Sequence, residues 1–140
     1  YLKMNKFLSL IFCLLLSDYA LIAQEQEMKR FVSIEPKDFK YLVKCDTPNL
    51  VADVRESFEY KINRIKGAVN IPSSGNLEFA ADTLNKNLAL FFYCTSGFRS
   101  EKVCEKFSDK GFRKIYNLNG GIGTWKKKGF PVERRRPRKK

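Results

Sequence analysis

The chain has 140 residues, enough for one domain of ordinary size, and 44% of them are hydrophobic, enough for a packed core. The formal net charge is +12 and the chain contains no histidine, which excludes the most common general base and a frequent metal ligand. The four cysteines form no CxxC pair, which argues against a zinc ribbon and a thioredoxin-type redox motif. We therefore expect no metal and no cofactor.

Residues 1–23 have the pattern of a secretory signal peptide. A short basic start at Met4 and Lys6 precedes an apolar segment at residues 7–16, and Ala23 is a small residue at the expected cleavage site. The apolar segment is shorter than a typical membrane span, so we expect a cleaved bacterial signal and an exported protein, periplasmic or secreted. An uncleaved anchor and a misread start are the alternatives. Residues 24–30 are polar and are expected to form a linker.

Strands and helices are expected to alternate after this linker. In chain order, the pattern predicts a strand at 31–34, a helix beginning near Pro36, a strand at 49–54, a helix at 57–62, a strand at 68–71, a helix at 79–84, a strand at 88–93, a helix from 99 to 110, a strand at 114–116 and a helix at 122–128. This alternation predicts one α/β domain over residues 31–132, with a parallel sheet and helices on both faces.

A cysteine follows the most apolar predicted strand. Residues 88–93, LALFFY, are long enough for one buried strand, and after the turn Val103, Cys104 and Phe107 recur at helical spacing. Cys94 is therefore expected at the carboxyl end of a buried strand, in a loop that opens a helix. Ligands bind at this place in open parallel sheets.

The helix start after Cys94 predicts a reactive thiolate. The first N–H groups of a helix have no partner within it, and a turn folded back onto them forms an anion site. A cysteine in such a site has a lowered pKa, and Arg99 adds positive charge at the rim. The alternative is that Cys94 is a small buried apolar residue. Because Gly97, Arg99 and Ser100 follow in register, we favour the reactive interpretation.

Four stretches together resemble one family. Residues 94–100, CTSGFRS, resemble the active-site loop of rhodanese-type sulfurtransferases. Residues 51–56, VADVRE, resemble the family's strand with an Asp-x-Arg turn, and residues 66–72, KGAVNIP, resemble its Gly-Ala-x-Asn-x-Pro strand. Residues 118–125, LNGGIGTW, match its Gly-Gly-x-x-x-Trp helix start. The stretches occur in the family's order.

This resemblance implies a rhodanese-like three-layer α/β/α fold with a five-stranded parallel sheet. It implies a sulfurtransferase that moves sulfane sulfur from a donor such as thiosulfate or a persulfide to a thiol or cyanide through a persulfide on Cys94, held by N–H groups of residues 95–99. The expected partners are a small sulfur donor and a thiol acceptor, including a protein thiol, and the expected state is a monomer. Glu59 matches a carboxylate common in the family. The expected site residues are catalytic Cys94 and Arg99 and substrate-binding Thr95, Ser96, Gly97, Phe98, Ser100 and Arg55.

Three features leave parts of this interpretation open. Arg64 stands where the family usually has histidine, which concerns local packing. Phe98 makes the loop rim apolar and favours a larger or less charged donor than thiosulfate. Asp53 and Arg55 either frame the site or form a buried ion pair that fixes the strand end.

Two alternative functions remain at this point. A cysteine phosphatase or arsenate reductase is disfavoured, because only four residues separate Cys94 from Arg99 and Tyr93 replaces the histidine that tyrosine phosphatases use. This shorter loop suits one sulfur atom better than a tetrahedral phosphate. A non-catalytic module that carries sulfur or binds a partner is compatible with the same loop.

The remaining cysteines, the tryptophan and the tail have simpler interpretations. Cys104 and Trp125 are expected in the core, and Cys45 in an exposed polar loop. Residues 133–140, ERRRPRKK, form a basic tail that we expect to be solvated. Because no aromatic residue interleaves with these charges, no specific nucleic-acid binding is expected, and weak contact with an anionic surface is the alternative.

Overall fold

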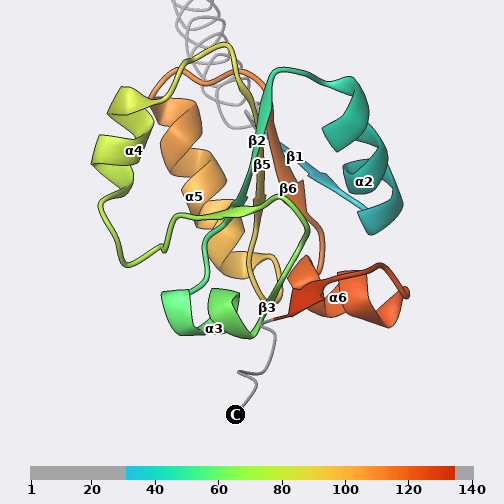
Figure 1. Cartoon of the computed structure of the whole chain (residues 1–140). Coiled ribbons are helices and arrows are strands. Elements are labelled where there is room, and N and C mark those ends of the chain that lie inside the picture. The colour runs from blue at the N-terminus through green and yellow to red at the C-terminus, as the bar shows by residue number, and fades with distance from the viewer. Residues whose placement is uncertain (1–30, 135–140) are drawn as a thin grey trace, which may run out of the picture.

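The computed structural model describes residues 31–134, and its centre is a five-stranded parallel sheet (Figure 1). The strand order is β1-β6-β5-β2-β4. The strands are β1 Val32–Ile34, β2 Asn49–Asp53, β4 Val69–Asn70, β5 Ala89–Tyr93 and β6 Ile115–Leu118. The predicted fold class is confirmed, and the strand that precedes Cys94 is the central strand of the sheet.

Helices cover both faces of this sheet. In Figure 1, α4 and α5 lie on one side of the sheet, and α2 and α6 lie on the other. The helices are α2 Pro36–Cys45, α3 Ser57–Ile62, α4 Leu77–Thr83, α5 Phe98–Asp109 and α6 Gly121–Lys127. The short helix α3 lies beyond the carboxyl end of β2, close to the turn that joins β5 to α5.

The side chains of β5 alternate between the two halves of the core. Leu90 and Phe92, followed by Cys94, pack with the apolar face of α5, which includes Cys104. Phe91 and Tyr93 belong to the other half, together with α2 and α6 side chains that include Trp125. All residues of β5 are buried, which explains their continuous apolar run. Cys104 and Trp125 are core residues, as predicted.

Several element boundaries differ slightly from the predicted ones. Helix α4 begins at Leu77, because the side chain of Asn76 accepts a hydrogen bond from the N–H of Phe79 and caps the helix. Strand β6 continues to Leu118, because its parallel pairing with β1 extends to that residue. Helix α2 extends to Cys45, so the expectation of Cys45 in a loop is wrong, although the residue is exposed as expected.

A two-stranded antiparallel ribbon was not predicted. Its strands are β3 Asn63–Arg64 and β7 Glu133–Arg134, so ordered structure includes the first two residues of the stretch expected to be a basic tail. The side chain of Arg64 joins the two strands through an ion pair with Glu133, at 3.3 Å between Nε and Oε2. Its guanidinium also lies 4.9 Å from the ring centroid of Tyr60. Arg64 therefore has a packing role where the resembled family usually has histidine.

Some predicted segments lie outside the described residues. These are the signal peptide at residues 1–23, the linker at residues 24–30 and residues 135–140 of the tail. Within residues 31–134, no helix combines the length and the apolar character that crossing a membrane requires.

Candidate active site

Cys94 directly follows β5, and α5 begins at Phe98, so the turn between them joins a buried strand to a helix N-terminus. The backbone N–H of Gly97 donates a hydrogen bond to the Sγ atom of Cys94 at 3.1 Å. Cys94 exposes 0% of its surface, so its sulfur lies beneath the turn. The sequence predicted this position at the carboxyl end of the central strand.

Gly97 makes this turn sterically feasible. Its φ angle is +94°, a left-handed conformation that residues with a Cβ atom adopt at a cost. A Cβ atom at Gly97 would also lie only 3.1 Å from the carbonyl oxygen of Leu118. Glycine thus lets the turn fold back and aim its N–H groups at the sulfur.

The hydrogen bonds around Cys94 outweigh the effect of its burial on the thiol. Burial raises the pKa of Cys94. The hydroxyl and the N–H of Ser100 and the N–H groups of Ser96 and Gly97 lower it by a larger amount, so the net pKa lies below the ordinary value of a thiol. Burial strongly raises the pKa of Cys104, which packs in the same half of the core. The two buried cysteines therefore differ in thiol acidity, and Cys94 is the one whose pKa lies below its ordinary value.

Helix α6 holds the same turn from the other side. The N–H of Ile122 donates to the carbonyl oxygen of Cys94 at 2.9 Å, and the N–H of Gly123 donates to that of Thr95 at 3.0 Å. A Cβ atom at Gly121 would overlap the Cys94 carbonyl, so glycine is required for this close approach. The carbonyl groups of Cys94 and Thr95 are thereby engaged with α6, while the N–H of Gly97 remains directed at the sulfur.

Arg99 is held by a carboxylate from α3. Its guanidinium forms two hydrogen bonds with Glu59, at 2.9 and 3.0 Å, and a third with the hydroxyl oxygen of Thr95 at 3.1 Å. The Arg99 hydrogen bond lowers the pKa of Glu59 to about 2. The Glu59 carboxylate therefore largely compensates the positive charge expected at the rim, and the Arg99 side chain links the turn to α3.

A buried polar chain supports the turn from beneath. Oγ of Ser100 lies 2.7 Å from Oδ1 of Asn117, and Nδ2 of Asn117 donates to the carbonyl oxygen of Gly97 at 3.3 Å and to the hydroxyl oxygen of Ser33 at 3.1 Å. Asn117 is 3% exposed and lies on β6. Sequence reasoning did not select Asn117. A polar residue between Tyr116 and Leu118 in a buried strand was the available signal.

The structure brings most predicted site residues together, but Arg55 has other contacts. The side chain of Arg55 is engaged by the carboxylate of Asp53, at 2.6 Å for the shortest N–O distance, and by the carbonyl oxygen of Asn63. Both members of the pair are buried. Of the two interpretations left open, the buried ion pair at the end of β2 describes these contacts. Phe98 lies at the rim with 63% of its surface exposed.

This arrangement is suited to one kind of chemistry. The thiolate is a nucleophile, and the surrounding N–H groups stabilise negative charge on a sulfur atom bound to it. Within residues 31–134, no cluster of three or more potential ligand side chains could hold a metal ion. The fold and the site thus define an α/β protein with a buried cysteine of lowered pKa in a cradle of backbone N–H groups.

Comparison with known proteins assigns the family. The Rhodanese-like domain family matches residues 35–128, and the chain belongs to this family. A crystal structure of a rhodanese-related protein from Thermoplasma volcanium is similar at 33% identity with a TM-score of 0.64, covering 72% of this chain and 96% of that one. A crystal structure of the BH2092 protein from Bacillus halodurans has a TM-score of 0.66 at 26% identity, covering 85% and 87%.

Two curated relatives have names that point to different roles. The chain is 38% identical over 87 residues to the "Putative sulfur carrier protein YrkF" of Bacillus subtilis, covering 62% of this chain and 46% of the relative. It is 32% identical over 98 residues to the "tRNA uridine(34) hydroxylase" of Bdellovibrio bacteriovorus, covering 67% of this chain and 28% of the relative. The chain therefore spans less than half the length of each of these relatives.

Proposed function

We propose that the chain is a rhodanese-type sulfurtransferase that carries sulfane sulfur as a persulfide on Cys94. The central observation is the 3.1 Å hydrogen bond from the Gly97 N–H to Sγ, in a turn at a helix N-terminus. A thiolate that is already formed needs no general base, which agrees with a chain that lacks histidine. Membership of the Rhodanese-like domain family supports a role related to sulfur transfer.

The proposed reaction has two displacements. The Cys94 thiolate attacks the outer sulfur of the donor, the donor S–S bond breaks, and the remainder leaves with the electron pair as a thiolate or, from thiosulfate, as sulfite. An acceptor thiolate then attacks the outer sulfur of the Cys94 persulfide, forms its own persulfide and restores the Cys94 thiolate. Cyanide as acceptor gives thiocyanate. The N–H groups of the turn stabilise the negative outer sulfur between the two steps.

The rim of the turn favours one class of donor. The ring of Phe98 is exposed, and the ammonium group of Lys102 lies 4.7 Å from its centroid. Apolar surface beside a positive charge suits an organic persulfide better than small, doubly charged thiosulfate. Because Cys94 is covered at rest, the donor reaches it when the exposed residues Thr95, Ser96 and Phe98 shift.

Intact mass spectrometry tests this proposal. Incubation with glutathione persulfide should add one sulfur, about 32 mass units, to Cys94, because a stable persulfide needs the N–H cradle. Cys94→Ser should lose both the adduct and transfer to cyanide, while Cys45→Ser, a matched control at an exposed cysteine, should keep both. Unchanged transfer in Cys94→Ser would refute the proposal.

A sulfur carrier without turnover of its own is the second candidate. The similarity to the Bacillus subtilis protein named as a putative sulfur carrier favours it. A carrier would form the Cys94 adduct but release it only to a specific protein acceptor, so multiple turnovers with small thiols distinguish the two. Hydroxylation of tRNA is not proposed for this chain, because the match covers 28% of that relative.

We further propose that the protein is exported and that the signal is removed. The basic start and apolar segment of residues 1–23 support this proposal. Expressed in a bacterium, the protein should be found outside the cytoplasm with its N-terminus near Gln24. Recovery of the full-length chain from the cytosol would contradict it.

A further inference from the structure

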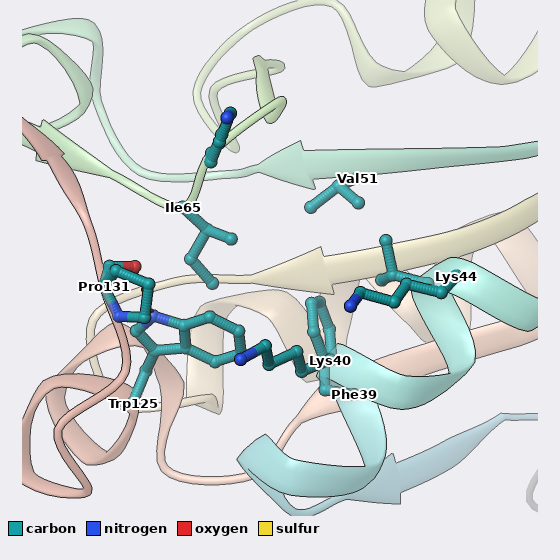
Figure 2. Close-up of a pocket in the computed structure, with 9 residues that line it drawn as sticks. Phe39, Lys40, Lys44, Val51, Ile65, Trp125 and Pro131 are labelled. Atoms are coloured by element: carbon teal, nitrogen blue, oxygen red, sulfur yellow. Dashed lines mark hydrogen bonds between the residues drawn. The ribbon is translucent and has the colours of Figure 1, made fainter.

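An apolar pocket lies on the sheet face that α2 and α6 cover, the face opposite α5. Its volume is about 230 Å³. Figure 2 shows Val51 and Ile65 on the sheet side of this pocket and Trp125 with Pro131 facing α2 across it. The remaining apolar wall comes from α2. Cys94 packs in the other half of the core, so the pocket is separate from the active site.

Three lysines line the same pocket. Lys40 and Lys44 come from α2, and Lys66 precedes the turn at Gly67. In Figure 2, the side chains of Lys40 and Lys44 both extend from α2 toward the side where Ile65 and Trp125 lie. No carboxylate within residues 31–134 pairs with any of the three. The Lys40 ammonium also lies 5.5 Å from the ring centroid of Phe130, a contact that supplies no counter-charge. Apolar walls with ammonium groups that have no carboxylate partner are complementary to a molecule that has an apolar body and an anionic end.

The side chains that form the walls of the pocket contact one another. The ring of Phe39 meets that of Trp125 edge-on at 6.1 Å between centroids, and the indole N–H of Trp125 donates to the carbonyl oxygen of Pro131 at 2.9 Å. The indole nitrogen is thus satisfied within the protein. An occupant would meet carbon surface here and find its polar partners at the lysines.

We propose that this pocket binds a short-chain anionic amphiphile, an aliphatic body with one carboxylate head group. The size supports a small occupant, since about 230 Å³ is below the range of roughly 300 to 1,000 Å³ that is usual for drug-sized ligands. A lipid with two acyl chains exceeds it. The aliphatic chain covers Val51, Ile65 and Trp125, and the carboxylate lies among the ammonium groups of the lysines.

Octanoate is the ligand used to test this proposal, and the intrinsic fluorescence of Trp125 reports its binding. Trp125 is the only tryptophan in the chain, so intrinsic fluorescence reports directly on one wall of the pocket. Octanoate should change this fluorescence saturably, and the apparent affinity should fall as salt is added. 1-Octanol has the same body without charge and octyltrimethylammonium has the opposite charge, so the first should bind at least about tenfold more weakly and the second should not saturate.

Charge-reversal variants show where the anion lies. Lys44→Glu with Lys66→Glu should weaken octanoate at least about tenfold, since attraction becomes repulsion at the pocket. Lys61→Glu with Arg113→Glu makes the same change in net charge at exposed positions outside the pocket and should leave the affinity unchanged. Persulfide formation on Cys94 should be normal in both pairs, so this test is independent of the proposed function.

Several results would overturn the proposal. These are no saturable fluorescence change with octanoate, equal affinity for octanoate and octanol, and equal weakening by the two charge-reversal pairs. Each would show that the lysines do not select an anionic head group at this pocket. If a second copy of the chain covers the pocket instead, dilution of the protein without ligand should change the Trp125 fluorescence. That result would also overturn the proposal.

Discussion

The N–H of Ile122 donates a hydrogen bond to the carbonyl oxygen of Cys94, at 2.9 Å, so the start of α6 directly contacts the residue that we propose as the nucleophile. Because Gly121 has a φ angle of +58° and no Cβ atom, the two backbones can approach this closely. The geometry of the cradle therefore depends on a helix that contributes no side chain to it.

Replacing Gly121 by alanine should damage both stability and sulfur transfer. The added Cβ atom would overlap the Cys94 carbonyl, in addition to the cost of about 1–2 kcal/mol for a left-handed non-glycine residue. Gly129→Ala is the matched control, because Gly129 has a φ angle of +78° at the other end of α6 with nothing within 4 Å of a new Cβ atom. Urea unfolding and transfer assays should show a larger stability loss for Gly121→Ala and a transfer defect in that variant alone. Equal effects of the two substitutions would contradict the role of the close approach.

Ser100→Ala should raise the pKa of the Cys94 thiol. The Ser100 hydroxyl is the leading hydrogen-bond contribution that lowers this pKa against the effect of burial. Its loss also removes the 2.7 Å contact between Oγ of Ser100 and Oδ1 of Asn117. The measurement is the pH dependence of alkylation, which should move to higher pH.

Ser108→Ala is the control for this prediction. Ser108 is a second buried serine of α5, and its Oγ atom has no partner within the described residues. Its replacement should leave both the alkylation profile and stability close to those of the unmodified protein. An unchanged profile in Ser100→Ala would show that the backbone N–H groups alone set the thiol pKa.

The three described cysteines should react in an order that separates thiolate character from access. Cys94 should react with iodoacetamide at a pH below about 8.5, the usual pKa of a free thiol, because its own pKa is lowered. Its full burial should make it slow toward a bulky maleimide, whereas exposed Cys45 should react with both reagents. Cys104 should react with neither in the folded protein. Peptide mapping identifies the sites, and rapid labelling of Cys94 by the bulky reagent would show an open loop.

Glu59→Gln should weaken the contact between α3 and the turn, which the Arg99–Glu59 ion pair makes. At neutral pH the loss of the charged pair with Arg99 should cost about 1 kcal/mol, a modest value because both side chains are partly exposed. The folded-state pKa of Glu59 is about 2, against roughly 4.3 when unfolded, so this stability is present above the unfolded value and is lost as pH falls toward the folded one. The free energies of unfolding of the two proteins in urea should therefore differ at neutral pH and approach each other as the pH falls toward about 2. Glu105→Gln, an exposed change on α5, should show no such convergence.

Local patterns in the sequence were sufficient to predict the main fold and the position of Cys94 in it. The apolar run before Cys94, the glycine of the turn and the helical spacing after it are relations between near neighbours, so side-chain chemistry and backbone geometry determine them locally. The alternation of strands and helices predicted the parallel sheet, and the carboxyl end of its central strand located the site.

Only the tertiary structure decided which distant residues support that site. Glu59 meets Arg99 across 40 positions of sequence, and Asn117 meets Ser100 across 17. The order of strands brings these partners together, and no local period encodes it. The sequence left two interpretations of Arg55, a frame for the site or a buried ion pair. Its burial beside Asp53 supports the ion pair. The pairing of Arg64 with Glu133 and the pocket beneath α2 arise in the same way, because they are made of segments whose contact depends on how the whole chain packs.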